Sequence, residues 1–248
     1  MVILMVENSF DLKGIDYKIA REVVNAFEIL FEKYPRLENK INYVSSFQNV
    51  YDEIERVCKC LLNVYCKAKI IDVLNKLNKT FAFSYNMPNE NDLNPYFYYN
   101  YPSQVKVIVR KPVFQAIAIN ESWSYETFYY KLTQNHALNR TYPIDIKGII
   151  YHEIGHIFSN IFYLLDDKYF MNKVFMLMNR RDINYSLYSL RNPDEFIAEH
   201  FALYMIGNNN EASKFIGEYI TKLYNFYENT TVFDYDDKYQ TLVRKIIV

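Results

Sequence analysis

The sequence predicts an α+β fold in a single domain spanning residues 1–248. Half of the 248 residues are hydrophobic and 23% are charged, so the chain can bury a sizeable core. Helical and strand-like patterns alternate over residues 1–144, whereas residues 145–248 show helical patterns alone. Because no linker rich in Gly, Ser or Pro separates these two halves, we expect one domain and not two.

The first half is predicted to contain two helices and four short strands. Apolar residues three and four positions apart indicate a helix over 16–34, ended by Pro35, and a longer helix over 51–77. Apolar and β-branched runs predict strands at 41–47, 80–85, 105–110 and 113–120. The stretch 86–103 is rich in Asn and Pro and is expected to be a loop.

The second half is predicted to be all-helical. Its helices are expected over 146–165, 168–180, 194–206 and 211–228. The first of them carries one apolar stripe about 100° wide, formed by Ile146, Ile150, Ile154, Ile157, Ile161 and Leu165. A stripe of this kind predicts that one side of the helix faces the core.

Charge and composition exclude several classes of partner. The formal net charge is -1, so no basic footprint for nucleic acid or for an anionic membrane is expected. No run of eighteen apolar residues exists, and the amino-terminal stretch lacks a basic region and a cleavage site typical of a Sec signal. We therefore expect no transmembrane segment, and a protein that is cytoplasmic or exported by a non-Sec route.

Three cysteines lie within nine positions, at Cys58, Cys60 and Cys66. An odd, clustered set is no disulfide framework. On a helix, Cys58 and Cys60 would point about 200° apart, so they could not share a metal ion. Ordinary buried thiols in a reducing compartment are expected.

The motif with the clearest chemical meaning is His152-Glu153-Ile154-Gly155-His156, an H-E-x-x-H sequence. On a helix, residues four apart differ by about 40° in direction, so both imidazoles can reach one tetrahedral zinc ion. Glu153 would lie beside the metal, where a carboxylate can take a proton from an activated water. The alternative, a pair of satisfied core histidines, fits less well because both rings lie opposite the apolar stripe, beside Gly148, Gly155 and Ser159.

A third metal ligand is expected from a later helix. The metzincin extension of the motif fails, because Ser159 and Phe162 stand where Gly and His are required. The segment 192–199 (NPDEFIAE) is a strong helix start, with Asn192 at the N-cap. On that helix Glu195 and Glu199 share a face with two alanines, whose small side chains would let it approach the H-E-x-x-H helix closely.

These two segments together resemble the zinc-peptidase domain of anthrax lethal factor and its relatives, which include the clostridial Pro-Pro endopeptidases and phage-encoded domains. The motif-level similarity covers about 145–205 and includes Tyr188, seven positions before Glu195. The resemblance implies a zincin-like metallopeptidase fold with a small mixed sheet and an active-site helix. It also implies that the strand over 114–120 is the sheet edge along which an extended peptide lies.

The resemblance further implies a role for each matched residue. One zinc ion per chain would be held by His152, His156 and Glu195, with Glu153 as general base and acid. Tyr188 would donate a hydrogen bond to the oxyanion. Glu199 would accept the free N–H of a ligand histidine; the other interpretation of Glu199 is a solvated helix position, and that of Tyr188 is chance in a chain with 25 tyrosines.

Two histidines are left outside this site. His200 points about 140° away from Glu195 and is expected at the surface or in packing. His136 is expected in a loop over 135–143, from which it could reach the substrate cleft.

Three functions remain in competition at this point. The leading hypothesis is a zinc-dependent endopeptidase of the gluzincin type acting on protein or peptide substrates. The second is a catalytically silent or structural zinc-binding module of a phage particle or toxin. A deformylase-like hydrolase, which takes a cysteine as third ligand, is disfavoured because the only cysteines lie about 90 residues upstream. Substrate-binding residues cannot be named from the sequence.

Overall fold

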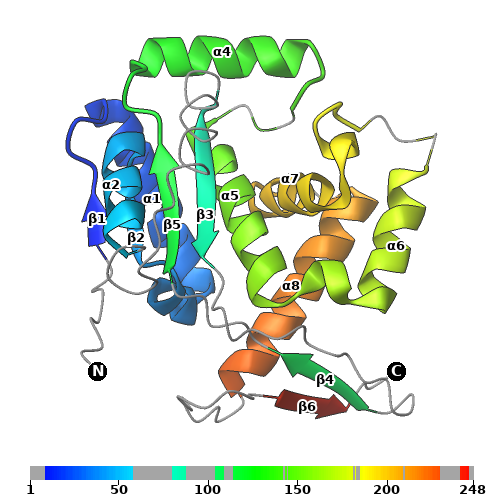
Figure 1. Cartoon of the computed structure of the whole chain (residues 1–248). Coiled ribbons are helices and arrows are strands. Elements are labelled where there is room, and N and C mark those ends of the chain that lie inside the picture. The colour runs from blue at the N-terminus through cyan, green and yellow to red at the C-terminus, as the bar shows by residue number, and fades with distance from the viewer. Residues whose placement is uncertain are drawn as a thin grey trace, which may run out of the picture.

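A computed structural model describes residues 9–57, 80–87, 104–108, 114–141, 143, 145–180, 182, 185–208, 210–229 and 241–245. The fold is α+β, as predicted, with a small mixed sheet beside a group of helices (Figure 1). The α-helices are α1 (Tyr17–Lys33), α2 (Phe47–Val57), α4 (Tyr125–Ala137), α5 (Ile146–Ile161), α6 (Lys168–Met178), α7 (Pro193–Met205) and α8 (Glu211–Asn229). The strands are β1 (Ser9–Asp11), β2 (Tyr43–Ser46), β3 (Ala82–Met87), β4 (Gln104–Ile108), β5 (Phe114–Ile119) and β6 (Thr241–Lys245). The described residues also form the short 3-10 helices η1 (Pro35–Lys40), η3 (Leu164–Asp166) and η4 (Ser189–Arg191).

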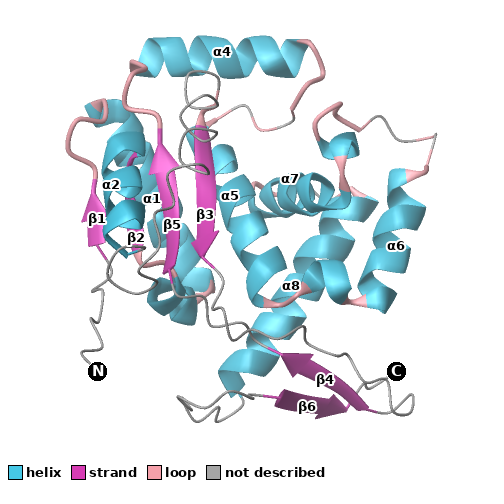
Figure 2. Ribbon diagram, in the orientation of Figure 1, coloured by secondary structure: helices cyan, strands magenta, loops and turns pink. Residues whose placement is uncertain are grey.

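The main sheet has the strand order β1-β2-β5-β3. β1, β2 and β5 are parallel, and β3 runs antiparallel to β5, with Ser84 opposite Ile117. Among the described strands β5 therefore lies inside the sheet, with β1 and β3 at its two edges, which corrects the expectation that 114–120 is the edge strand. β4 and β6 form a separate antiparallel pair (Figure 2).

Helices cover both faces of the main sheet because successive side chains of a strand point to opposite faces. Ala116 and Ala118 of β5 pack against Phe47, Val50 and Ile54 of α2. The alternate residues Ile117 and Ile119 belong to the larger core on the other face, which α1 and α5 help to form.

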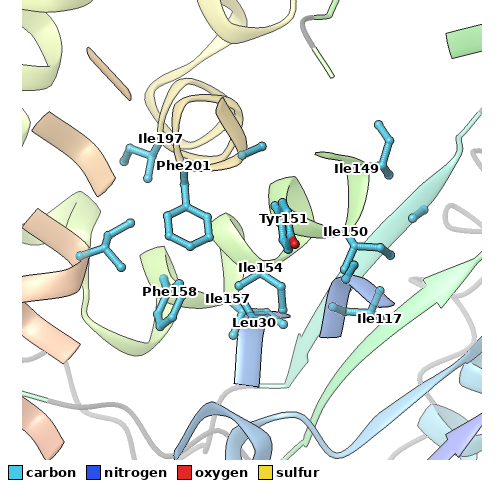
Figure 3. Packing of buried hydrophobic residues seen from close by; sticks show 14 of the residues in the cluster. Leu30, Ile117, Ile149, Ile150, Tyr151, Ile154, Ile157, Phe158, Ile197 and Phe201 are labelled. Carbon is cyan, nitrogen blue, oxygen red and sulfur yellow. The ribbon is translucent and has the colours of Figure 1, made fainter. Parts of the chain in front are cut away.

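The apolar stripe of α5 is buried as predicted, except at its last position. Ile150, Ile154 and Ile157 are at most 1% exposed, and Figure 3 shows them close to Leu30 of α1 and Ile117 of β5. Leu165 is 47% exposed, because α5 ends at Ile161 and the chain turns through a left-handed residue, Tyr163, before η3. The helix predicted over 146–165 is thus one turn shorter than expected.

The remaining predicted elements agree with the structure in position, apart from the strand β1, which was not predicted, and four further corrections. Phe47, expected at the end of a strand, begins α2, because the Glu121 carboxylate accepts the backbone N–H groups of Phe47 and Gln48. The later part of the predicted helix over 51–77, with all three cysteines, lies outside the described residues.

The second correction is α4, which was not predicted. Ser124 caps this helix and Asp16 accepts the Tyr125 N–H, but only Phe128 and Leu132 of α4 are buried. The third is that His136 lies in the last turn of α4 and not in a loop. The fourth is β6, which shows that the second half is not all-helical. Among the helices that the structure describes, none is long and apolar enough to cross a lipid bilayer.

Candidate metal site and surrounding residues

The site is formed where α5 and α7 cross at very short distance. A Cβ atom added to Gly155 would lie 2.6 Å from the Cα of Ala198, closer than real Cβ contacts allow. Glycine on one helix and alanine on the other therefore let the two backbones touch. This contact brings the histidine face of α5 opposite the first turn of α7, as the small residues in both segments predicted.

The first turn of α7 is held by its cap. The Asn192 side chain accepts the Glu195 N–H at 2.9 Å, and Pro193 occupies the first helical position. Asp194 and Glu195 follow at once, at the helix end whose partial positive charge favours carboxylates. Two acidic side chains thus project from a fixed turn toward α5.

The structure brings His152, His156 and Glu195 together, as predicted. The Nε2 atoms of the two histidines are 3.2 Å apart, and the Oε2 atom of Glu195 lies 3.2 Å from the first and 3.3 Å from the second. Their side chains are only 8%, 18% and 17% exposed, in that order. This buried group could hold a metal ion.

Comparison with known proteins does not assign the chain to a family. No family model, curated protein or solved structure matches it. The similarity to lethal factor-like peptidases therefore stays a prediction, and the interpretation of the site rests on its own geometry and charges.

The electrostatics of the three residues favour a positive charge between them. Burial opposes the charged form of His156, but hydrogen bonds to Asp194 and Glu195 outweigh it and raise the pKa of His156 to about 10. Burial opposes the charge of Glu195 as well, yet its hydrogen bonds to His152 and His156 hold the pKa of Glu195 well below its usual range. A proton or a metal cation satisfies this arrangement, and the two compete for it.

Glu153, the expected general base, is 7% exposed and faces the edge strand of the sheet. Its Oε2 atom accepts the backbone N–H of Ser84 in β3 at 2.6 Å. The negative charge of Glu153 contributes to the raised pKa values of both His156 and Tyr188, which places the carboxylate near both groups. The candidate base therefore lies between the metal site and β3, which is an edge strand among the residues that the structure describes.

Tyr188 also lies at the site, just before η4. Its ring centroid is 5.7 Å from that of His152. Burial, the charges of Glu195 and Glu153, and a hydrogen bond to Glu195 raise the pKa of Tyr188 well above its usual range, so its hydroxyl keeps its proton. The segment is held by the residues after α4, because Leu187 N–H donates to Asn139 O at 2.9 Å and Tyr188 N–H to Arg140 O at 3.0 Å.

Glu199 lies one turn beyond Glu195 and is fully buried, so a solvated helix position is wrong. The structure shows a carboxylate beside the N–H of a candidate ligand histidine, but it belongs to Asp194 and not to Glu199. The Oδ2 atom of Asp194 lies 2.8 Å from Nδ1 of His156. The predicted role of Glu199 toward the other ligand histidine stays a prediction.

Sequence reasoning missed three residues of the site. Asp194 and Ser159 form a hydrogen-bonded pair beside His156, and Ser84 donates to Glu153 through its backbone. Two of these had a signal: Asp194 directly precedes a predicted ligand, and Ser159 lies one helical turn after His156, on the same side of α5. No side-chain pattern could reveal Ser84, because its backbone N–H is what takes part.

The two remaining histidines, His136 and His200, are not among the candidate metal ligands. His136 is exposed and its ring contacts the Thr141 carbonyl at 3.3 Å, so the structure gives no support for a role in the site. His200 is fully buried, with its ring stacked on Phe196 at 4.0 Å and edge-on to Tyr185. Packing, one of the two expectations for His200, is confirmed.

His200 makes the fold sensitive to acid. Burial lowers the pKa of His200 from 6.5 to about 4, and among the described residues its Nε2 atom has no hydrogen-bond partner. As the pH falls, the unfolded chain binds a proton at His200 at a higher pH than the folded protein does. The contribution of His200 to the free energy of unfolding is therefore complete above pH 6.5 and is lost as the pH drops toward 4, by up to about 3 kcal/mol. His156 does not add to this change, since its raised pKa alters stability only above pH 6.5.

This expectation is checked by urea unfolding of the metal-free protein at pH 7, 5.5 and 4. The His200→Gln variant should lose less stability over that range than the wild type, by up to about 3 kcal/mol. Removing the metal beforehand keeps its own pH-dependent binding out of the measurement. Equal losses in both proteins would show that His200 is not responsible.

Proposed function

We propose that this protein is a zinc-dependent endopeptidase. The supporting observation is the nearly equilateral triangle of His152 Nε2, His156 Nε2 and Glu195 Oε2, with sides of 3.2, 3.2 and 3.3 Å. Tetrahedral zinc binds nitrogen and carboxylate oxygen at about 2.0–2.2 Å, which requires ligand atoms about 3.3–3.5 Å apart. Two imidazoles, one carboxylate and a fourth open position are the donor set of a catalytic zinc site. The triangle therefore fits one zinc ion per chain.

Bound zinc would supply a Lewis acid and lower the pKa of a water molecule. The residues of the chain do the rest. Glu153, oriented by the Ser84 N–H, takes a proton from the attacking water and passes it to the leaving amine. Tyr188, whose hydroxyl stays protonated, donates a hydrogen bond to the oxyanion as the carbonyl becomes tetrahedral. In this proposal the three metal ligands, Glu153 and Tyr188 act together on one peptide bond.

The substrate is proposed to be a protein or peptide that binds in extended form along β3. Ser84 sits opposite Ile117 of β5, yet its N–H is directed to Glu153 and not to that strand. In an antiparallel pair, a residue whose N–H points away from its partner also directs its C=O away. On this outer edge the Ser84 N–H is already bonded to Glu153, and the Ser84 C=O is directed to the same side, where it suits β-strand addition by a peptide.

The proposal is tested by metal analysis together with a cleavage screen. The purified protein should carry close to one equivalent of zinc, and His156→Ala should abolish stoichiometric binding. The zinc-loaded protein should cleave members of a proteome-derived peptide library, and the chelator-treated protein should not. Stoichiometric zinc without cleavage of any peptide would reject the peptidase and favour a structural zinc-binding module, and full zinc occupancy in His156→Ala would reject the site itself.

A further inference from the structure

His156 is contacted at both ends of its ring by neighbouring carboxylates of α7. Glu195 Oε2 lies 3.3 Å from its Nε2 atom, and Asp194 Oδ2 lies 2.8 Å from its Nδ1 atom. Only the Nε2 end faces the other candidate ligands. The two nitrogens of this ring therefore have different surroundings, supplied by consecutive residues of one helical turn.

Asp194 is itself held in place from α5. Its second oxygen, Oδ1, accepts the Ser159 hydroxyl at 2.7 Å. Ser159 is 4% exposed and lies three residues after His156, so both partners of Asp194 come from adjacent turns of the same helix. Although the Asp194 side chain is 39% exposed, both of its oxygens are engaged by protein groups at short distance.

The contact between Asp194 and Nδ1 of His156 determines which nitrogen of the ring can bind a metal ion. A neutral imidazole has one N–H and one lone pair, and a hydrogen bond to one nitrogen decides which nitrogen keeps the lone pair. An acceptor at Nδ1 keeps the proton there and leaves the Nε2 lone pair directed at the metal site. A carboxylate in that place also makes the ring more basic and a stronger ligand.

We propose that Asp194 is the positioning residue of the metal site: its carboxylate holds the Nδ1–H of His156, Ser159 holds the carboxylate, and Nε2 is thereby presented to the metal. This inference rests on the proposed function only for the presence of zinc and not for hydrolysis. It differs from the role expected for Glu199, because the acceptor comes from the residue directly before the ligand Glu195. One capped turn of α7 then supplies both a ligand and the group that orients another ligand.

The test is the dissociation constant for zinc, measured by competition with a chromophoric chelator at pH 7.5. Asp194→Ala should weaken zinc binding by about 10- to 100-fold, the range typical of losing such a partner. Asp194→Asn should lose less, since its amide oxygen can still accept the Nδ1–H although the charge is gone. Ser159→Ala should raise the dissociation constant for zinc by a few-fold. Asp52→Asn, an exposed carboxylate of α2 on the far face of the sheet, serves as the matched control and should bind as the wild type does.

A second measurement separates orientation from a general loss of structure. In the zinc-loaded wild type, long-range proton–nitrogen NMR spectra should show His156 with its proton on Nδ1. In Asp194→Ala that proton should exchange much faster with water, while the circular dichroism spectrum of the metal-free variant stays that of the folded control.

The outcomes distinguish this inference from the proposed function. A zinc affinity of Asp194→Ala within twofold of the wild type, while His156→Ala does not bind, would overturn the positioning role and leave the metal site intact. A wild type that binds no zinc would overturn both. Zinc binding that depends on Asp194, in a protein that cleaves no peptide, would reject the peptidase and support the positioning role.

Discussion

Replacing Glu153 with Gln is expected to lower the turnover number by about two to four decades, the span of a lost general acid-base. Gln has nearly the same shape and can still accept the Ser84 N–H through its amide oxygen, so the contact between α5 and β3 should persist. It cannot take a proton from water or return one to an amine. Zinc content should not change, because Glu153 is not among the three candidate ligands.

The measurement is single-turnover hydrolysis of a peptide found in the cleavage screen, at saturating zinc. Glu32→Gln, an exposed position of α1, is the matched control and should hydrolyse at the wild-type rate. If Glu153→Gln retained more than about a tenth of the wild-type rate, the carboxylate could not be the main proton acceptor. The mechanism proposed for this site would then be wrong even if zinc were bound.

Tyr188→Phe is expected to lower the turnover number by about a hundredfold or more, roughly 2.7 kcal/mol of transition-state stabilisation. The lost hydrogen bond forms fully only in the transition state, so the Michaelis constant should change little. The phenyl ring keeps the contact with His152, whose ring centroid lies 5.7 Å away. Zinc content at saturation should also stay the same, since the hydroxyl contacts a ligand and is not itself one of the three.

A tyrosine that only packs predicts a different result. Its replacement by Phe would cost less than about 1.5 kcal/mol of stability, the usual contribution of one hydrogen bond, with turnover intact. Turnover and urea unfolding are therefore measured on the same samples, with Tyr17→Phe, 76% exposed, as the control. A turnover number within threefold of the wild type would exclude Tyr188 as an oxyanion donor.

Local sequence patterns were sufficient for the elements that bury one clear face. The apolar stripes of α1 and α5 have helical spacing, and both helices lie within a few residues of the predicted bounds. The cap at Asn192 and Pro193 placed the start of α7 for the same reason, because capping depends on residues close in sequence. α4 was not predicted because it buries only Phe128 and Leu132 and exposes Tyr129 and Tyr130.

The candidate ligands could also be predicted, because the ability to bind a metal ion depends on residue type and on spacing along the helix. Two histidines four apart must share a helix face, and a carboxylate on a capped later helix is a natural third ligand. The sequence also contained the small residues, Gly155 and Ala198, that permit a close helix contact. The predicted ligands and small residues lie together in the structure, so residue type and spacing were sufficient to predict this part of the site.

Only the tertiary structure decided which groups surround the ligands. Strand order follows from long-range pairing, so the sequence could not show that β3, and not β5, is the sheet edge beside Glu153. Asp194 became the partner of His156 because the crossing of α5 and α7 brings the first turn of one helix against the histidine face of the other. Residue type and spacing determine what a side chain can do, whereas contacts between distant segments determine which partner it meets, since those contacts depend on how the helices and strands pack.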